Sequence, residues 1–135
     1  MVLAIAAKQD LEIDQSDIIS AFLKGKIDTL VFLLQVEGFK LGSHKYCCLN
    51  KTIYGLCQTA RMWYSVLNRA LIEFGFTRLD ADMACWVKIS KEGIIFIVVH
   101  VDDTLSIGSR RDMDNTKAQL AKKFKTKTWG LEKSL

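Results

Sequence analysis

The sequence contains no proline, has only two histidines, and lacks an apolar run long enough to span a membrane. Its most strongly apolar stretch, Ile94 to Val99, holds six residues, whereas a membrane-spanning helix needs about 20. The N-terminal residues do not combine a leading positive charge with the apolar length of a secretory signal. We therefore expect an intracellular protein, cytoplasmic or nuclear, that is not secreted and has no membrane partner.

Four cysteines are present, but their spacing is not that of a metal site or a disulfide framework. No two of them form a Cys-x-x-Cys pair, and adjacent Cys47 and Cys48 on an extended segment would point in opposite directions. The sequence also contains no Gly-x-Ser-x-Gly nucleophile motif and no Gly-x-x-x-x-Gly-Lys phosphate loop. Catalytic chemistry is therefore left to carboxylates.

The composition is that of a globular chain with an uneven charge distribution. Half of the 135 residues are apolar and a quarter are charged, which suits one ordinary domain. Residues 1–109 carry a net charge of −1, and residues 110–135 carry +5. Such a basic segment can contact nucleic-acid phosphates, here through Arg110, Arg111, Lys122 and Lys123. The commoner alternative is a solvated face on a terminal helix.

Glycine and hydrophobic periodicity divide the chain into short elements. Arg61 to Phe74 has apolar side chains three and four residues apart and is followed by Gly75, which predicts an amphipathic helix. A second helix is expected over Asp112 to Phe124. Strands are expected at residues 11–17, 31–34, 46–49, 85–89, 94–99 and 104–107, with a helical turn at 18–23. The interleaved order predicts the α+β class.

Three aspartates stand at the ends of predicted strands. Asp102 and Asp103 directly follow the most apolar one, and Asp17 ends the first. Such a pair alone is most often a solvated turn, because Asp is a favoured turn residue. A third carboxylate from another strand end favours a cation site instead. Carboxylate oxygens suit Mg²⁺, and two such ions can support phosphoryl transfer.

Four segments, in this order and spacing, resemble the reverse transcriptase domain of copia-type (Ty1/copia) retrotransposons. They are LEIDQSDIISAFLKG at residues 11–25, QVEGF at 35–39, LNKTIYGLCQTARMWY at 49–64 and HVDD at 100–103. The resemblance implies a palm-like antiparallel sheet backed by helices, as a single partial domain over residues 1–135 from which the fingers and thumb are largely missing. It further implies a truncated and diverged copy.

The resemblance also implies the site. Asp17 and Asp102 are then the principal metal ligands, with Asp103 beside them and the backbone carbonyl of Ile18 as a further oxygen ligand. Two ions, Mg²⁺ or Mn²⁺, are expected. The implied partners are an RNA template with a DNA primer, deoxynucleoside triphosphates (dNTPs), and the remainder of a retrotransposon polyprotein.

Two further residues match nucleotide-binding positions of the family. Phe22 matches the aromatic residue beneath the incoming sugar, where its ring would exclude a 2′-hydroxyl, and Gln58 matches the glutamine that positions nucleotide and template. On the residues alone, the commoner interpretation of Phe22 is a core aromatic.

The chain departs from the family pattern at several positions. Val36 and Ala60 replace prolines, Cys57 replaces a lysine, and His100 replaces the aromatic residue before Val-Asp-Asp. Two functions therefore stay open: an RNA-directed DNA polymerase fragment, or a catalytically inactive remnant that is at most a weak nucleic-acid-binding module. An unrelated Mg²⁺-dependent phosphatase or nuclease would need the four matches to be accidental.

Overall fold

The computed structural model describes residues 2–19, 21, 27, 29–38, 42, 45–53, 55–56 and 58–129. Contacts divide the chain into two compact units, which we name the sheet unit (residues 1–21 and 67–135) and the hairpin unit (residues 22–66). The elements in chain order are α1 (Val2–Lys8), β1 (Glu12–Ile18), β2 (Phe32–Leu34), β3 (Tyr46–Cys48), α2 (Thr59–Glu73), β4 (Thr77–Arg78), β5 (Cys85–Ser90), β6 (Gly93–His100), β7 (Asp103–Gly108), α3 (Arg110–Lys123) and β8 (Thr126–Trp129). The assignment of residues 1–135 to one partial domain stays a prediction.

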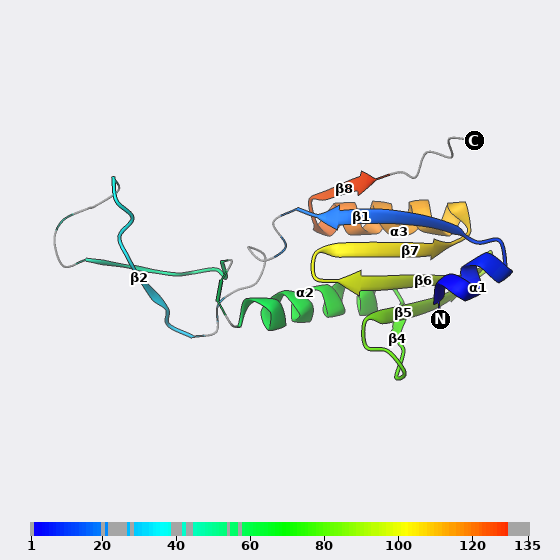
Figure 1. The fold of residues 1–135 in the computed structure, drawn as a ribbon, viewed down its shortest axis with the longest axis horizontal. Helices are drawn as coiled ribbons and strands as arrows, with labels where there is room; N and C mark the ends of the chain where they lie inside the picture. The colour runs from blue at the N-terminus through cyan, green and yellow to red at the C-terminus, as the bar shows by residue number, and fades with distance from the viewer. Residues whose placement is uncertain are drawn as a thin grey trace. The chain divides into compact units, whose positions relative to one another are not determined.

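The sheet unit is built on six antiparallel strands in the spatial order β4-β5-β6-β7-β1-β8 (Figure 1). β5 and β6 form one hairpin, and β6 and β7 form a second in which His100 pairs with Asp103. β1, from the N-terminal part of the chain, lies between β7 and β8. Ile and Val dominate β6, because branched side chains pack well on a pleated surface.

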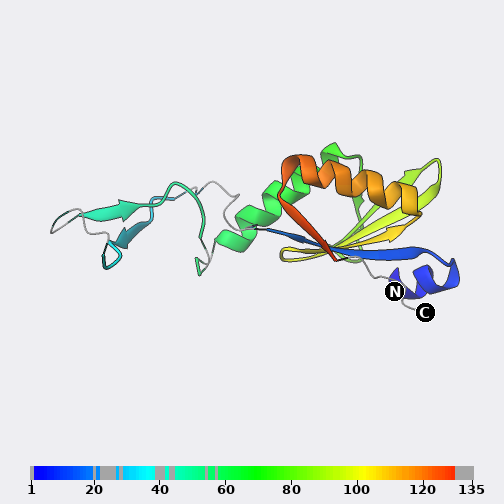
Figure 2. The same ribbon diagram turned by 90° about the horizontal axis from the view of Figure 1, so that it is seen from above.

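Helices cover the two faces of this sheet differently (Figure 2). Neighbouring residues of a strand point to opposite faces. The face that carries Asp14 and Ile97 packs against α3, and we name it the α3 face. On this side Ile97, Met113 and Leu120 are at most 1% exposed. Burying each such side chain stabilises the fold by about 1.5–3 kcal/mol.

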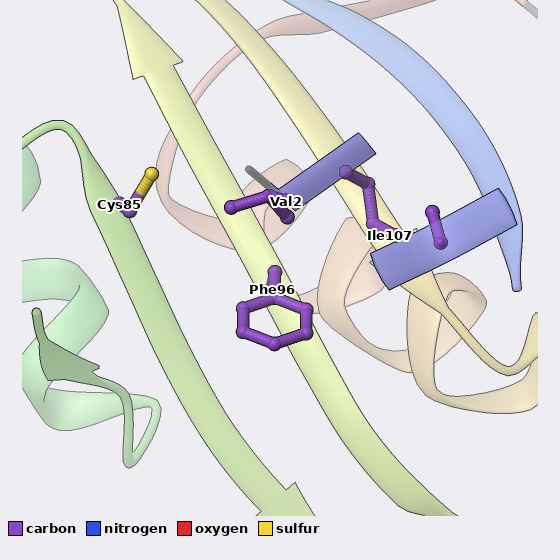
Figure 3. Packing of buried hydrophobic residues seen from close by; sticks show 5 residues of the cluster. Val2, Cys85, Phe96 and Ile107 are labelled. Atoms are coloured by element: carbon purple, nitrogen blue, oxygen red, sulfur yellow. The ribbon is translucent and has the colours of Figure 1, made fainter. Parts of the chain in front are cut away.

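The opposite face, which we name the α1 face, packs against the N-terminal helix. Val2 and Ala6 of α1 form a buried cluster with Cys85, Phe96 and Ile107 of three neighbouring strands. Figure 3 shows Val2 close to Ile107 and Phe96. Val2, Ile5 and Ala6 are spaced for one side of a helix, and this side is the one that α1 buries or half-buries.

α2 ends as its sequence predicts. Gly75 has a φ of 83°, a conformation that glycine adopts without steric cost. Its N–H donates to the carbonyl of Ile72 at 2.9 Å, and the N–H of Phe76 donates to the carbonyl of Leu71 at 3.0 Å. These two bonds form a Schellman motif, which satisfies carbonyls that the helix end leaves unpaired.

The N-terminus of α3 is capped by the side chain of Ser109, which accepts from the N–H of Asp112 at 3.3 Å. Asp112 in the first turn and Lys122 and Lys123 in the last turn complement the helix dipole. Both local signals favour a helix that begins at Arg110 and ends at Lys123.

The hairpin unit contains β2 and β3, which pair antiparallel with Phe32 opposite Cys48 and Leu34 opposite Tyr46. It also contains the first half of α2, up to residue 66. Thr59, where α2 begins, donates its hydroxyl to the carbonyl of Ile53 at 2.7 Å. This bond ties the start of the helix to the preceding segment.

The predicted α+β class is confirmed, as are the expected strands and the two long helices, with ends that shift by one or two residues. The sequence analysis missed α1, β4 and β8. Of the helical turn expected at residues 18–23, residues 20, 22 and 23 lie outside the described residues, and Ile18 is the last residue of β1. Among the described residues, no helix combines the length and the apolar character needed to cross a membrane.

Candidate functional site

Polar side chains form a row across one end of the sheet unit. His100 on β6 pairs with Asp103 on β7, Asp103 pairs with Asp17 on β1, and Asp17 pairs with Lys127 on β8. Residues directly opposite in antiparallel strands share a face, with Cβ atoms about 4.5–5.5 Å apart. This polar row therefore places an imidazole, two carboxylates and an ammonium group in succession on the α1 face.

The α1 face changes character along the strands. Ile13, Phe96 and Ile107 lie at the end that packs against α1. In Figure 1, α1 lies at the opposite end of the strands from the β6–β7 turn. The polar row stands at that turn, with His100 and Lys127 exposed and both aspartates half-buried. The same face thus has an apolar end covered by a helix and a charged end that water reaches.

The turn between β6 and β7 holds Asp102 in place. Val101 and Asp102 form its two-residue loop, and Val101 has a φ of 59°. A β-branched residue rarely adopts this conformation. The N–H of Ile18 donates to the carbonyl of Asp102 at 2.9 Å, which fixes the turn to the end of β1. All three predicted aspartates are thereby brought to one end of two adjacent strands.

The charges in the polar row partly offset one another. Asp17 has the carboxylate of Asp103 on one neighbouring strand and the ammonium group of Lys127 on the other. Like charges directly opposite destabilise a sheet, and opposite charges stabilise it. Gln15 donates from Nε2 to Oδ1 of Asp103 at 3.2 Å, which orients that carboxylate along the strand.

The donors of this site suit a hard cation. Mg²⁺ is usually bound through one or two carboxylates together with phosphate oxygens and water, and Asp17 and Asp103 supply such a pair. Within the part of the chain that the structure describes, no three His, Cys, Asp or Glu side chains are grouped closely enough to hold a metal ion. Asp17 and Asp103 thus supply the kind of donor that such a cation takes. The ligand set of Asp17, Ile18, Asp102 and Asp103 stays a prediction.

The basic residues predicted to contact nucleic acid lie on α3, the helix that covers the opposite face. Arg110 lies 3.2 Å from Glu12 and 3.8 Å from the buried Asp14. Arg111 lies 2.8 Å from Glu92.

The two lysines at the end of α3 also have neighbours on the α3 side of the sheet. Lys123 forms an ion pair with Glu73 and lies over the ring of Phe74. Lys122 lines a cleft together with Lys88 and Ser90 of β5. Nucleic-acid binding by Arg110, Arg111, Lys122 and Lys123 stays a prediction, and at least three of them already have carboxylate partners.

The two predicted nucleotide-binding residues belong to the hairpin unit's range. Phe22 lies outside the described residues. Gln58 is half-buried and precedes α2, where its carbonyl accepts from the N–H of Met62 at 3.1 Å. Their roles stay predictions.

Sequence reasoning missed Lys127 in the polar row. A signal was present, because Lys125-Thr126-Lys127-Thr128 alternates charged and β-branched residues as an edge strand does. The partner strand could not be inferred, since β1 lies more than a hundred residues earlier in the chain.

Comparisons with known proteins agree on one family. Residues 1–135 match the family described as Reverse transcriptase (RNA-dependent DNA polymerase). The Retrovirus-related Pol polyprotein from transposon TNT 1-94 of Nicotiana tabacum is 32% identical over 133 residues, covering 96% of this chain and 10% of that protein. The corresponding polyprotein from transposon RE1 of Arabidopsis thaliana is 33% identical over 130 residues, covering 94% of this chain and 9% of that protein.

A third relative, the Retrovirus-related Pol polyprotein from transposon RE2 of Arabidopsis thaliana, is 36% identical over 111 residues, covering 81% of this chain and 8% of that protein. The chain thus spans about a tenth of the length of these relatives. No solved structure matches it. The family match over the whole chain and these relatives show that the chain belongs to the reverse transcriptase (RNA-dependent DNA polymerase) family of copia-type retrotransposon polyproteins.

Proposed function

We infer that this chain is part of the palm of a reverse transcriptase, which transfers nucleotides from dNTPs to the 3′-hydroxyl of a primer paired to an RNA template. The observation that carries the proposal is the pairing of Asp17 with Asp103, together with the bond that holds Asp102 beside Ile18. A palm-like sheet backed by helices agrees with α3 on one face and the polar row on the other. Membership in the family supports the same reaction.

In this proposal Asp17 and Asp102 are the principal ligands of two Mg²⁺ or Mn²⁺ ions, with Asp103 and the carbonyl of Ile18 completing the set. Once bound, the ions would activate the primer hydroxyl and stabilise the leaving pyrophosphate. The chain's own part is positioning. Gln15 orients the Asp103 carboxylate, and the bond from Ile18 keeps the β6–β7 turn against β1. Such fixed geometry supplies much of the acceleration in reactions of this kind.

Two further residues would serve the nucleotide. Phe22 would select deoxyribonucleotides through the bulk of its ring, and Gln58 would position the nucleotide and the template. If so, Phe22→Ala in an active enzyme should raise ribonucleotide incorporation relative to deoxyribonucleotide incorporation.

A second candidate function is a catalytically inactive remnant that retains weak nucleic-acid binding. The observation that favours it is the replacement of the family's aromatic residue by His100, next to the β6–β7 turn.

Metal binding separates the two candidates directly. Free Mn²⁺ can be followed by electron paramagnetic resonance while the full chain is titrated in the presence of pyrophosphate, which supplies phosphate oxygens. Binding that is lost in Asp17→Asn and in Asp102→Asn, but kept in Asp114→Asn, supports the polymerase proposal. Asp114 is the matched control because it is an exposed carboxylate on α3. Equal affinities in all four proteins would favour the inactive remnant.

Activity can also be tested in a longer protein. The chain can replace the matching residues of the tobacco polyprotein, and the chimera can be assayed by primer extension on an RNA template. We expect extension that disappears in a variant carrying Asp102→Asn and Asp103→Asn.

A further inference from the structure

Thr104 directly follows Asp103 on β7 and lies on the α3 face, behind the polar row. The residue is 1% exposed. Its hydroxyl donates to the backbone carbonyl of Ser16 on β1 at 3.0 Å, and Ser16 is the residue directly opposite Thr104 in the strand pairing. The next pair toward the turn is Asp17 with Asp103. The bond therefore joins the residue before one aspartate to the residue after the other.

Two cross-strand bonds thus bracket this pair of aspartates. On the turn side, the N–H of Ile18 donates to the carbonyl of Asp102 at 2.9 Å. On the other side, the Thr104 hydroxyl donates to the carbonyl of Ser16. That carbonyl shares a rigid planar peptide group with the N–H of Asp17. A bond that fixes the direction of the carbonyl therefore also fixes the backbone that carries the Asp17 side chain.

The bond from Thr104 opposes a repulsion that the site itself creates. Asp17 and Asp103 are like charges directly opposite each other on neighbouring strands, which destabilises the strand pairing. Both residues are half-buried, so salt and water screen the repulsion less than at an open surface. The Thr104 hydroxyl bonds where water is excluded, and such a bond is electrostatically stronger than one in water. It resists the separation of β1 from β7 at the charged end of the sheet.

We propose that Thr104 is a positioning residue for Asp17 and Asp103, whose carboxylates its hydroxyl holds at a spacing that suits a shared cation. This inference rests on the proposed function, because that function is what requires a cation there. Ligands that are already held in place lose less conformational freedom on binding, so the affinity is higher. Thr104 lies on the face opposite the polar row, and its effect reaches the carboxylates through the backbones of β1 and β7.

Ser16 offers a matched control on the opposite strand. Its side chain is also buried on the α3 face, but its hydroxyl has no hydrogen-bond partner among the described residues. Ser16→Ala therefore removes a buried hydroxyl beside the site and leaves the Ser16 carbonyl, which accepts the bond from Thr104. Thr104→Val removes that bond and keeps a branched side chain of similar shape. Thr104→Ser keeps the hydroxyl and removes only the methyl group.

The first measurement is the affinity of the full chain for Mn²⁺ in the presence of pyrophosphate, by electron paramagnetic resonance, under conditions where every variant is folded. We expect Thr104→Val to bind Mn²⁺ about three- to tenfold more weakly, as the loss of one hydrogen bond predicts. Ser16→Ala and Thr104→Ser should bind as the unaltered chain does, although Thr104→Ser loses stability with its methyl group. An unchanged affinity in Thr104→Val, or an equal loss in either of the other variants, would overturn the proposal.

The second measurement uses no metal and so separates this inference from the proposed function. Amide hydrogen exchange, followed by nuclear magnetic resonance in EDTA, reports how often a bonded N–H opens. We expect Thr104→Val to accelerate exchange at Ile18 about three- to tenfold, and to leave Phe76 unchanged, since Phe76 bonds to Leu71 at the end of α2. Equal acceleration at Ile18 and Phe76 would show a general loss of stability and would refute the positioning role. If the unaltered chain binds no Mn²⁺ and exchange changes only at Ile18, the proposed function fails while Thr104 still positions the aspartates.

Discussion

Val101 is held in a backbone conformation that costs the fold free energy. Its φ of 59° places a β-branched side chain where glycine is normally found. Such strain costs about 1–3 kcal/mol and persists only where surrounding structure imposes it. Here the imposing structure is the pairing of His100 with Asp103 and the bond from Ile18 to the carbonyl of Asp102.

We predict that Val101→Gly stabilises the protein. The substitution relieves the strain in the folded state. The greater conformational freedom of glycine in the unfolded chain reduces the gain in the free energy of unfolding by about 0.4–1 kcal/mol. The net gain in the free energy of unfolding should be about 1 kcal/mol by urea denaturation. Val101→Ala, which keeps Cβ but removes the branch, should gain less. A Val101→Gly protein no more stable than the original would show that the turn is unstrained.

Cys85 links stability to pH at the residue scale. Burial raises the pKa of its thiol, and the hydrogen bond to Asp82 at 3.5 Å and the charge of that carboxylate raise the pKa further. The folded protein then keeps its proton at pH values where the unfolded chain loses it. The thiol's contribution to stability is therefore complete below the ordinary cysteine pKa of the unfolded chain and is lost as the pH rises from there through the raised pKa of the folded protein.

We predict that the stability difference between the unaltered protein and Cys85→Ala shrinks as the pH rises above about 8.5. Urea denaturation at several pH values measures it. A difference that stays constant up to pH values near 10 would contradict the raised pKa of Cys85.

At the scale of elements, β1 and α3 are joined by a buried ion pair. Asp14 and Lys117 have side-chain exposures of 3% and 18%, and Asp14 Oδ1 has no hydrogen-bond partner among the described residues. Removing one partner of a buried pair is far more costly than replacing both by apolar residues, because the remaining charge is left desolvated.

We predict that Lys117→Met lowers the free energy of unfolding by about 3 kcal/mol, since Arg110 at 3.8 Å compensates Asp14 only in part. The double variant Asp14→Leu, Lys117→Met should return to within about 1 kcal/mol of the original protein. Thermal and urea denaturation of the three proteins provides the measurement. If the double variant is as unstable as the single one, the ion pair itself is what stabilises the contact between β1 and α3.

Elements with a strong local pattern were predictable from the sequence, and elements that depend on distant partners were not. α2 carries its own periodicity and its own stop at Gly75, and the hairpin of β5 and β6 is marked by apolar strands around a short turn. β8 has four residues and no apolar alternation, and its pairing with β1 becomes visible only in the fold. The three aspartates were predicted because they stand at the ends of strands that the sequence itself marks. Lys127 was not predicted because the sequence marks β8 as a strand only weakly.

At the scale of the whole molecule, the net charge of +4 does not show that charged side chains are arranged differently on the two faces of the sheet unit. α3 contributes cations that pair with acids such as Glu12, Asp14 and Glu92. The α1 face carries Asp17 and Asp103 of the proposed site, with Lys127 of β8 opposite Asp17, and Asp102 stands in the β6–β7 turn next to Asp103. Some cations of the basic C-terminal segment therefore form ion pairs within the fold. A charge count along the sequence could not distinguish these cations from the lysine that lies beside the proposed site.

We predict that the purified chain alone does not extend a primer at a measurable rate. Phosphoryl transfer of this type depends on positioning and charge stabilisation, which one polar row supplies only in part. Within the described residues no three donors converge, and a single lysine of β8 directly flanks Asp17. Position 57 adds no positive charge, because it holds cysteine where the family pattern has lysine. The assay is extension of oligo(dT) on poly(rA) with Mg²⁺ or Mn²⁺. Extension that vanishes in a protein carrying Asp102→Asn and Asp103→Asn would show that these 135 residues suffice for catalysis.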